Sequence, residues 1–395
     1  MTQPSSYDLQ GTEPLTAYVA DMSYFSGKLE AYLRYREIPY ERRLVTVQTL
    51  LHEVYRHTRM MKVPVVRLPD GRWLKDTTPM IQWLERHLPD VGVFPADPVT
   101  RFLALLIEDY ADEWCWRAAL YWRWCFPESR RHLSFRIGHE VLADWPVPKA
   151  IAGWYYGSRQ IRTYLTGDGL TKKTEPFIRS HYLDLLRAME SILSDRPFLL
   201  GDRPTIADFG LYGPMFRHYG LDPTPARVMR NEAPAVYAWL SRVWAARSGT
   251  ASAVPELPGF DHPGWTYFMR DIATNYAPFL IRNAEAWRSG AARFDHETEA
   301  VTYPKLKTVH YRVYCLQMLQ EAYAALSEDE QAQVQSHFEP FGGITLGEHV
   351  ESGLVGELTL PIEPKAAPPS FFERMVLTAT GTPWDLPQWV KPREK

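Results

Sequence analysis

The sequence has few cysteines, little net charge and no long apolar run. Its 395 residues contain three cysteines, Cys115, Cys125 and Cys315, an odd number at spacings that are not typical of zinc ligands. We therefore expect reduced thiols, no disulfide framework and no metal site, as in a cytoplasmic protein. The formal net charge is −3, which provides no basic field to attract nucleic acid or an anionic membrane surface.

Targeting and membrane segments are not evident either. Residues 1–14 lack a basic region followed by an apolar core, and no run approaches the roughly 18 apolar residues that a membrane span needs. We also find no internal repeat and no low-complexity tract. The composition instead favours a folded protein, since 45% of the residues are hydrophobic and 13% are aromatic.

The chain divides by pattern into a leader and three parts. After the leader (1–14), residues 15–90 read as strand, helix, strand, a less certain helix, hairpin and helix, which is an α/β order. In the hairpin, Pro69, Asp70 and Gly71 supply the turn. Prolines and a glycine then form a linker that leads into residues 98–249.

Residues 98–249 show helical periodicity, and residues 250–395 are an extension with further helical candidates. The pattern predicts one long helix from about 103 to 125 whose apolar face includes Tyr110 and Trp114. Thr205 and Asp208 have capping-box spacing, which we interpret as structural. The last 35 residues hold seven prolines, so we expect an extended tail that wraps the body or is mobile.

Three motifs in this order resemble the cytosolic glutathione transferase superfamily. They are VPVV (63–66), KDTTPMIQWLE (75–85) and FLLGDRPTIADFGLYG (198–213). SYFSGKLEAYLRYREIPYE, which begins at Ser23, is similar to the metaxin and failed-axon-connections branch. The resemblance implies an α/β thioredoxin-like N-terminal domain and an all-α helical domain. The C-terminal extension, which its periodicity predicts to be mostly helical, matches neither domain.

The resemblance places Ser23 where related transferases carry a catalytic cysteine or serine. A hydroxyl at the positive end of a helix can donate a hydrogen bond to a bound thiolate, and both effects favour ionisation. Tyr24 is an alternative donor. Ser26 lies where a resolving cysteine would sit, and because serine forms no mixed disulfide, thiolate transfer is favoured over thiol-disulfide exchange. Both serines can equally be simple helix caps.

The resemblance also implies a site for glutathione as co-substrate. It implies a cis peptide before Pro64 that turns the backbone of Val63 outward to pair with the tripeptide, while Asp76 and Thr77 meet its γ-glutamyl end. The sequence does not indicate which cation binds the glycine carboxylate of glutathione. The glutathione-binding residues expected are Lys62, Val63, Pro64, Asp76 and Thr77, and the open candidates for the glycine carboxylate are His52, Arg56 and His57.

The function that follows is transfer of glutathione, as thiolate, to a small apolar electrophile. The resemblance implies that Tyr110 and Trp114 line the acceptor cleft and that a homodimer is possible. One alternative is a non-catalytic scaffold of the same fold, with the extension as its working surface. Another is a glutathione-dependent isomerase, which is disfavoured because SYF stands at residues 23–25 in place of a Ser-Ser-Cys run.

Overall fold

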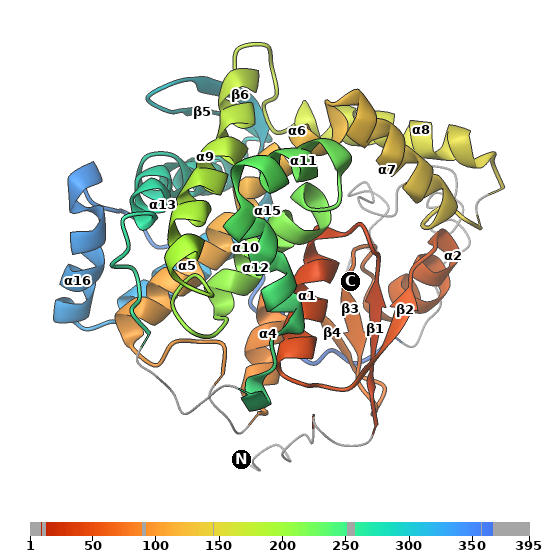
Figure 1. Ribbon diagram of the computed structural model, residues 1–395, viewed down its shortest axis with the longest axis horizontal. Helices are drawn as coiled ribbons and strands as arrows, with labels where there is room; N and C mark the ends of the chain where they lie inside the picture. The colour runs from red at the N-terminus through yellow and green to blue at the C-terminus, as the bar shows by residue number, and fades with distance from the viewer. Residues whose placement is uncertain are drawn as a thin grey trace.

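Apolar and β-branched residues near the start of the chain form a four-stranded sheet (Figure 1). The computed structural model describes residues 13–88, 92–144, 146–250, 257–356 and 358–365, together with Leu9. The sheet order is β2-β1-β3-β4, in which only β1 and β2 run parallel. The elements of this part are β1 (Leu15–Val19), α1 (Tyr24–Tyr35), β2 (Tyr40–Leu44), α2 (Val47–Thr49), η1 (Leu50–Tyr55), α3 (Arg56–Thr58), β3 (Val65–Arg67), β4 (Trp73–Lys75) and α4 (Thr77–Glu85).

The two edge strands of this sheet differ in how they are covered. The outer strand β2 has the charged sequence YERRL and is largely exposed, which discourages pairing with another chain. At the other edge, Ile362 from the C-terminal part exchanges both backbone hydrogen bonds with Trp73, at 2.8 and 2.9 Å. The described start of the proline-rich tail thus returns to the body, and residues 366–395 lie outside the described residues.

The middle of the chain is helical and packs against α1. Its elements are α5 (Pro98–Glu113), α6 (Cys115–Trp124), α7 (Pro127–His139), α8 (Lys149–Gln160), η2 (Ile161–Leu165), α9 (Glu175–Asp195), α10 (Ile206–Pro214), η3 (Met215–Tyr219), α11 (Pro223–Glu232), α12 (Pro234–Ala245) and η4 (Ser248–Thr250). The single long helix expected over 103–125 is wrong, because the helix is interrupted at Trp114 and divides into α5 and α6.

The extension is mostly helical, as its periodicity predicts. It comprises α13 (Trp265–Asp271), η5 (Ile272–Tyr276), α14 (Ala277–Arg288), β5 (Arg293–Glu297), β6 (Thr302–Lys307), α15 (His310–Ala324), α16 (Glu328–Phe338) and η6 (Glu339–Phe341). The extension also contains the antiparallel hairpin β5-β6, which its helical periodicity does not predict. In Figure 1, α13 and α16 lie on the side of the molecule away from the four-stranded sheet.

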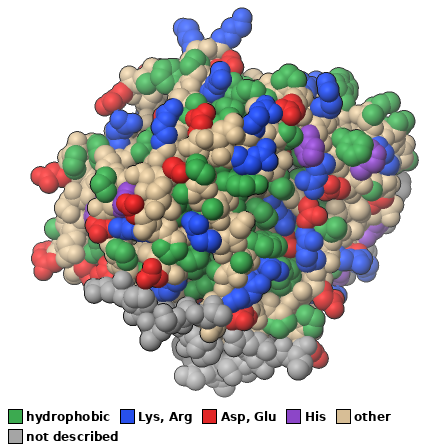
Figure 2. Space-filling view, in the orientation of Figure 1, with side chains coloured by type: hydrophobic (Ala, Val, Ile, Leu, Met, Phe, Trp, Pro, Cys, Tyr) green, Lys and Arg blue, Asp and Glu red, His purple; other side chains and the backbone are tan. Residues whose placement is uncertain are grey.

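One hydrophobic core runs through all three parts. It includes Val66 of the sheet, Leu211 of α10 and Phe279 of α14, each with no exposed surface. On the face shown in Figure 2, acidic and basic side chains lie among one another. Among the described helices, none has both the length and the apolar composition required to cross a membrane.

The expected capping box at the start of α10 is confirmed. Asp208 is fully buried, and its Oδ2 accepts from both the amide and the hydroxyl of Thr205. Its Oδ1 accepts from the amide of Leu199 at 3.0 Å and from the indole of Trp239 at 3.1 Å. One carboxylate therefore joins the loop before α10, the start of α10 and α12.

We predict that Asp208→Ala strongly destabilises the fold. It would leave several buried donors without an acceptor, and each such loss costs about 1–3 kcal/mol. We expect the free energy of unfolding in urea to fall by about 3–5 kcal/mol. Asp202→Ala is the control, because Asp202 is exposed in the same loop and should change stability by less than about 0.5 kcal/mol. Equal effects of the two substitutions would contradict this role.

Candidate active site between the domains

Ser23 is the N-cap of α1. It has extended backbone angles, and its Oγ accepts a hydrogen bond from the amide of Ser26 at 3.3 Å. This cap uses a lone pair of the Ser23 oxygen and leaves the hydroxyl hydrogen free to donate. Capping and donation to a ligand are therefore compatible at Ser23. Ser26 is fully buried and accepts from the amide of Ala20, so its role is structural.

Ser23 opens onto a cavity of about 470 Å³ where the three parts of the chain meet. One wall is apolar and aromatic, built by α1, α6, α7, α8 and η2. The other side is polar and includes residues of the extension. The apolar wall comprises Phe25, Trp116, Leu120, Trp124, Leu133, Ile137, Val141, Tyr156 and Tyr164, and the extension contributes Lys307, Val309, Tyr311 and Arg312.

The charged side chains of this cavity are mostly paired. Arg123 is buried against Asp222 at 2.6 Å, and Arg312 pairs with Glu113 at 3.0 Å. Lys62 and Lys307 also line the cavity, and neither makes a hydrogen bond or ion pair with any residue that the structure describes. The polar side of the cavity therefore carries two cations available to an anionic ligand.

Two residues of the segment Lys62–Pro64 line the same cavity as Ser23. The Val63–Pro64 peptide is cis, as the resemblance implies, and both Lys62 and Val63 line the cavity. The other candidate cations, His52, Arg56 and His57, do not line it.

Asp76 interacts with the extension. It precedes α4 with a φ of 68°, a left-handed backbone conformation, and its side chain does not cap that helix. Burial raises the pKa of Asp76 above its usual value, and the nearby phenol of Tyr311 acts in the opposite direction. Tyr311 lines the cavity whereas Asp76 and the buried Thr77 do not. Tyr311 thus lies near the carboxyl that the resemblance assigns to the γ-glutamyl end.

Tyr24 does not present its hydroxyl to the cavity. Its ring lines the cavity, but the hydroxyl donates to the carbonyl oxygen of Ala111 at 2.5 Å and the residue is 1% exposed. Burial raises the pKa of Tyr24 well above its ordinary value. This geometry favours Ser23 over Tyr24 as the donor.

Tyr110 and Trp114 lie apart from this cavity, contrary to the expectation for an acceptor cleft. The extension covers their face of the helix, and both donate to Asp271 of α13, the Tyr110 hydroxyl at 2.5 Å and the Trp114 indole at 3.0 Å. Neither residue lines the cavity at Ser23. The aromatic wall comes instead from α6, through Trp116 and Trp124, for which the sequence pattern indicates no role in the site.

Four carboxylates of α5 hold the parts of the chain together beside this cavity. Glu108 and Asp112 both accept from Lys28 of α1, which is fully buried. Burial alone would lower the pKa of Lys28, but the charges of Asp112 and Glu108 raise it. Asp109 accepts from the hydroxyl of Tyr276, and Glu113 pairs with Arg312. The extension and α1 are thus both attached to one helix.

Two family models match this chain. Residues 22–87 match the glutathione S-transferase N-terminal domain, and residues 180–246 match the glutathione S-transferase C-terminal domain. No curated protein matches the chain in sequence. The chain thus contains an N-terminal and a C-terminal glutathione S-transferase domain.

Several solved structures resemble part of the chain. A glutathione S-transferase from Pseudomonas fluorescens is 20% identical, covers 62% of this chain and all of its own, and has a TM-score of 0.37. The beta-etherase LigF from a Sphingobium species is 19% identical, covers 59% of this chain and 96% of its own, and has a TM-score of 0.42. A glutathione S-transferase from Methylobacterium radiotolerans, in complex with glutathione sulfonate, is 20% identical. It covers 62% of this chain and 98% of its own, and it has a TM-score of 0.38.

Asp109 makes the stability of the folded chain depend on pH. Burial raises its pKa to about 7, above the value in an unfolded chain. The folded protein therefore binds a proton more tightly, so this contribution to stability is complete below about pH 4 and is lost as the pH rises through 7. Asp109→Asn removes this dependence while keeping an oxygen that can accept from Tyr276.

We expect Asp109→Asn to become more stable relative to wild type as the pH rises. The difference in Tm between the two proteins should increase by roughly 3 °C or more from pH 5 to pH 8. Scanning calorimetry at several pH values measures it, with Asp202→Asn as an exposed control whose Tm difference should stay constant. A difference for Asp109→Asn that is the same at both pH values would contradict the assignment.

Proposed function

We propose that this protein is a glutathione transferase in which Ser23 stabilises the thiolate of glutathione. The observation that carries the proposal is the Ser23 hydroxyl, whose hydrogen is free and which opens onto the cavity at the start of α1. Donation to sulfur and the positive end of the helix both favour the ionised thiol. The free cysteines support a cytoplasmic location as part of this proposal.

Glutathione fits the polar side of the cavity at two points. The backbone of Val63 can pair with the tripeptide as with an added strand. Lys62 and Lys307 can each take a carboxylate, because both line the cavity without an ion pair among the described residues. Lys307 belongs to the extension, so this mode of binding makes the extension part of the substrate site.

The second substrate is proposed to occupy the apolar wall. Trp116, Leu120 and Trp124 lie on the same cavity as Ser23, and their surfaces are suited to an apolar or aromatic electrophile. In the reaction, sulfur of the thiolate forms a bond to carbon of the electrophile, and the leaving group departs with the electron pair of its broken bond. The proton of the thiol is released to solvent when the thiolate forms.

We predict that Ser23→Ala lowers the rate of glutathione transfer to 1-chloro-2,4-dinitrobenzene on the order of 10- to 100-fold at pH 7. The reason is loss of a donor to the thiolate, so the absorbance of bound thiolate near 240 nm should titrate at higher pH in the variant.

The matched control is Ser23→Thr, which keeps both the hydroxyl and the helix cap and should retain most of the rate. Calorimetry with glutathione tests binding separately. An unchanged rate in Ser23→Ala would remove Ser23 from the mechanism, and no heat with millimolar glutathione would remove the transferase proposal.

A second candidate function is a non-catalytic scaffold of the same fold. The observation that favours it is Tyr311, whose phenol interacts with Asp76, the residue expected to meet the γ-glutamyl end. In this alternative the extension replaces the ligand within the fold. The two functions differ in whether glutathione can compete with Tyr311.

We predict that Tyr311→Phe binds glutathione more tightly than wild type, by up to about tenfold, because the ligand no longer has to displace the Tyr311 hydroxyl from an interaction worth at most about 1–1.5 kcal/mol. Calorimetric titration measures the ratio of the two Kd values. Tyr314→Phe is the control, since Tyr314 lies on the same helix and does not line the cavity. Absence of binding in both wild type and Tyr311→Phe would support the scaffold function.

A further inference from the structure

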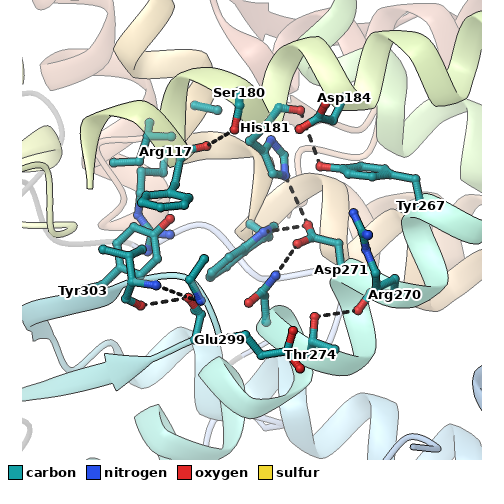
Figure 3. Close-up of a pocket in the computed structure, with 18 residues that line it drawn as sticks. Arg117, Ser180, His181, Asp184, Tyr267, Arg270, Asp271, Thr274, Glu299 and Tyr303 are labelled. Atoms are coloured by element: carbon teal, nitrogen blue, oxygen red, sulfur yellow. Dashed lines mark hydrogen bonds and ion pairs between the residues drawn. The ribbon is translucent and has the colours of Figure 1, made fainter. Parts of the chain in front are cut away.

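A second cavity, of about 260 Å³, lies between the helical part and the extension (Figure 3). It shares no lining residue with the cavity at Ser23. One side comes from α6 and α9 and the other from α13, η5, β6 and the loop between β5 and β6. The volume is somewhat below the roughly 300–1,000 Å³ of sites for drug-sized ligands, so a smaller molecule would fit.

Arg117 is the buried cation of this second cavity. It is 6% exposed, and its guanidinium carbon lies 4.7 Å from the centre of the Trp114 ring and 4.6 Å from that of Tyr303. The guanidinium thus lies over two aromatic rings, and its Nε donates to the carbonyl of Asp168 at 2.6 Å. Within the described part of the chain, Arg117 has no ion pair, and its two Nη nitrogens make no hydrogen bond yet keep accessible surface.

The nearest carboxylates are already bonded to other groups. Asp168 lies 3.7 Å from Arg312. Asp271 accepts from Tyr110, Trp114 and Asn275 and lies 3.4 Å from His181. Burial alone would raise the pKa of Asp271. The hydrogen bonds from His181 and from its other donors outweigh this effect and hold the pKa below its usual value. Asp271 is thus a satisfied anion, whereas Arg117 is a buried cation without one.

A buried charge without a partner is unfavourable, and contacts with aromatic rings do not neutralise it. The edge of a guanidinium presents parallel N–H donors that match the two oxygens of a carboxylate or phosphate. The Nη edge of Arg117 is the part of this side chain that is still free. Arg270, exposed and without an ion pair among described residues, lines the same cavity.

We propose that this second cavity binds a small molecule through an oxyanion group held by Arg117. The body of the ligand packs against Phe177 and Tyr267, which also line the cavity. Asp184 and Glu299 lie in the lining as well, so a singly charged carboxylate suits the cavity better than a doubly charged phosphate. This site is independent of glutathione and of Ser23.

The test uses the full chain with sodium benzoate and sodium phosphate as probes, against sodium chloride at equal ionic strength. We expect benzoate to raise the Tm of wild type and to bind in calorimetry, with phosphate weaker. Arg117→Met should weaken benzoate binding by at least about tenfold. Without any probe, Arg117→Met should be at least as stable as wild type, because a buried unpaired charge has been removed.

Two further variants keep the test decisive. Arg117→Lys retains the charge without the two-pronged edge and should bind benzoate with intermediate affinity. Arg179→Met is the control, because Arg179 is an exposed arginine near the rings of Trp122 and Phe126 outside the cavity, and should bind benzoate as wild type does. An Arg117-dependent response to phosphate alone would assign a phosphorylated ligand to the same group. No response of wild type to either probe, or an unchanged response in Arg117→Met, would overturn the proposal.

Discussion

Buried carboxylates must be given donors, and on α5 this requirement organises the whole molecule. Glu108 and Asp112 receive Lys28 from α1, while Asp109 and Glu113 receive donors from the extension. A buried carboxylate left without its partner would be strongly unfavourable. The glutathione transferase domains and the extension are therefore positioned by the same helix, and the cavity at Ser23 forms where the three parts meet.

This arrangement makes the extension part of both cavities. At Ser23 it supplies Tyr311 and the cations Lys307 and Arg312, and around Arg117 it supplies more than half of the lining residues. The face that bears Tyr110 and Trp114 is covered by α13, and part of the apolar lining of the cavity at Ser23 comes from α6. The extension therefore determines which surfaces of the helical part can contact a ligand.

Features that depend on neighbouring residues could be predicted from the sequence. The cap at Ser23, the capping box of Thr205 and Asp208, and the turn at Gly71 each involve residues within a few positions of one another. The burial of Tyr110 and Trp114 also followed from periodicity. The segment that covers these two residues could not be predicted, because a helical pattern shows that a face is apolar but not which distant segment packs on it. The pairing of Lys28 with Glu108 spans 80 residues and has no local signature.

The strand-like contact of Ile362 with Trp73 has a consequence for the order in which the chain is completed during synthesis. Residues 15–75 contain every strand of the four-stranded sheet, yet the open edge of β4 is closed only by a segment almost 290 positions later. A ribosome delivers the N-terminal part first, so that edge is exposed while the rest of the chain is made. The nascent sheet thus depends on the last part of the chain for its protection from other strands.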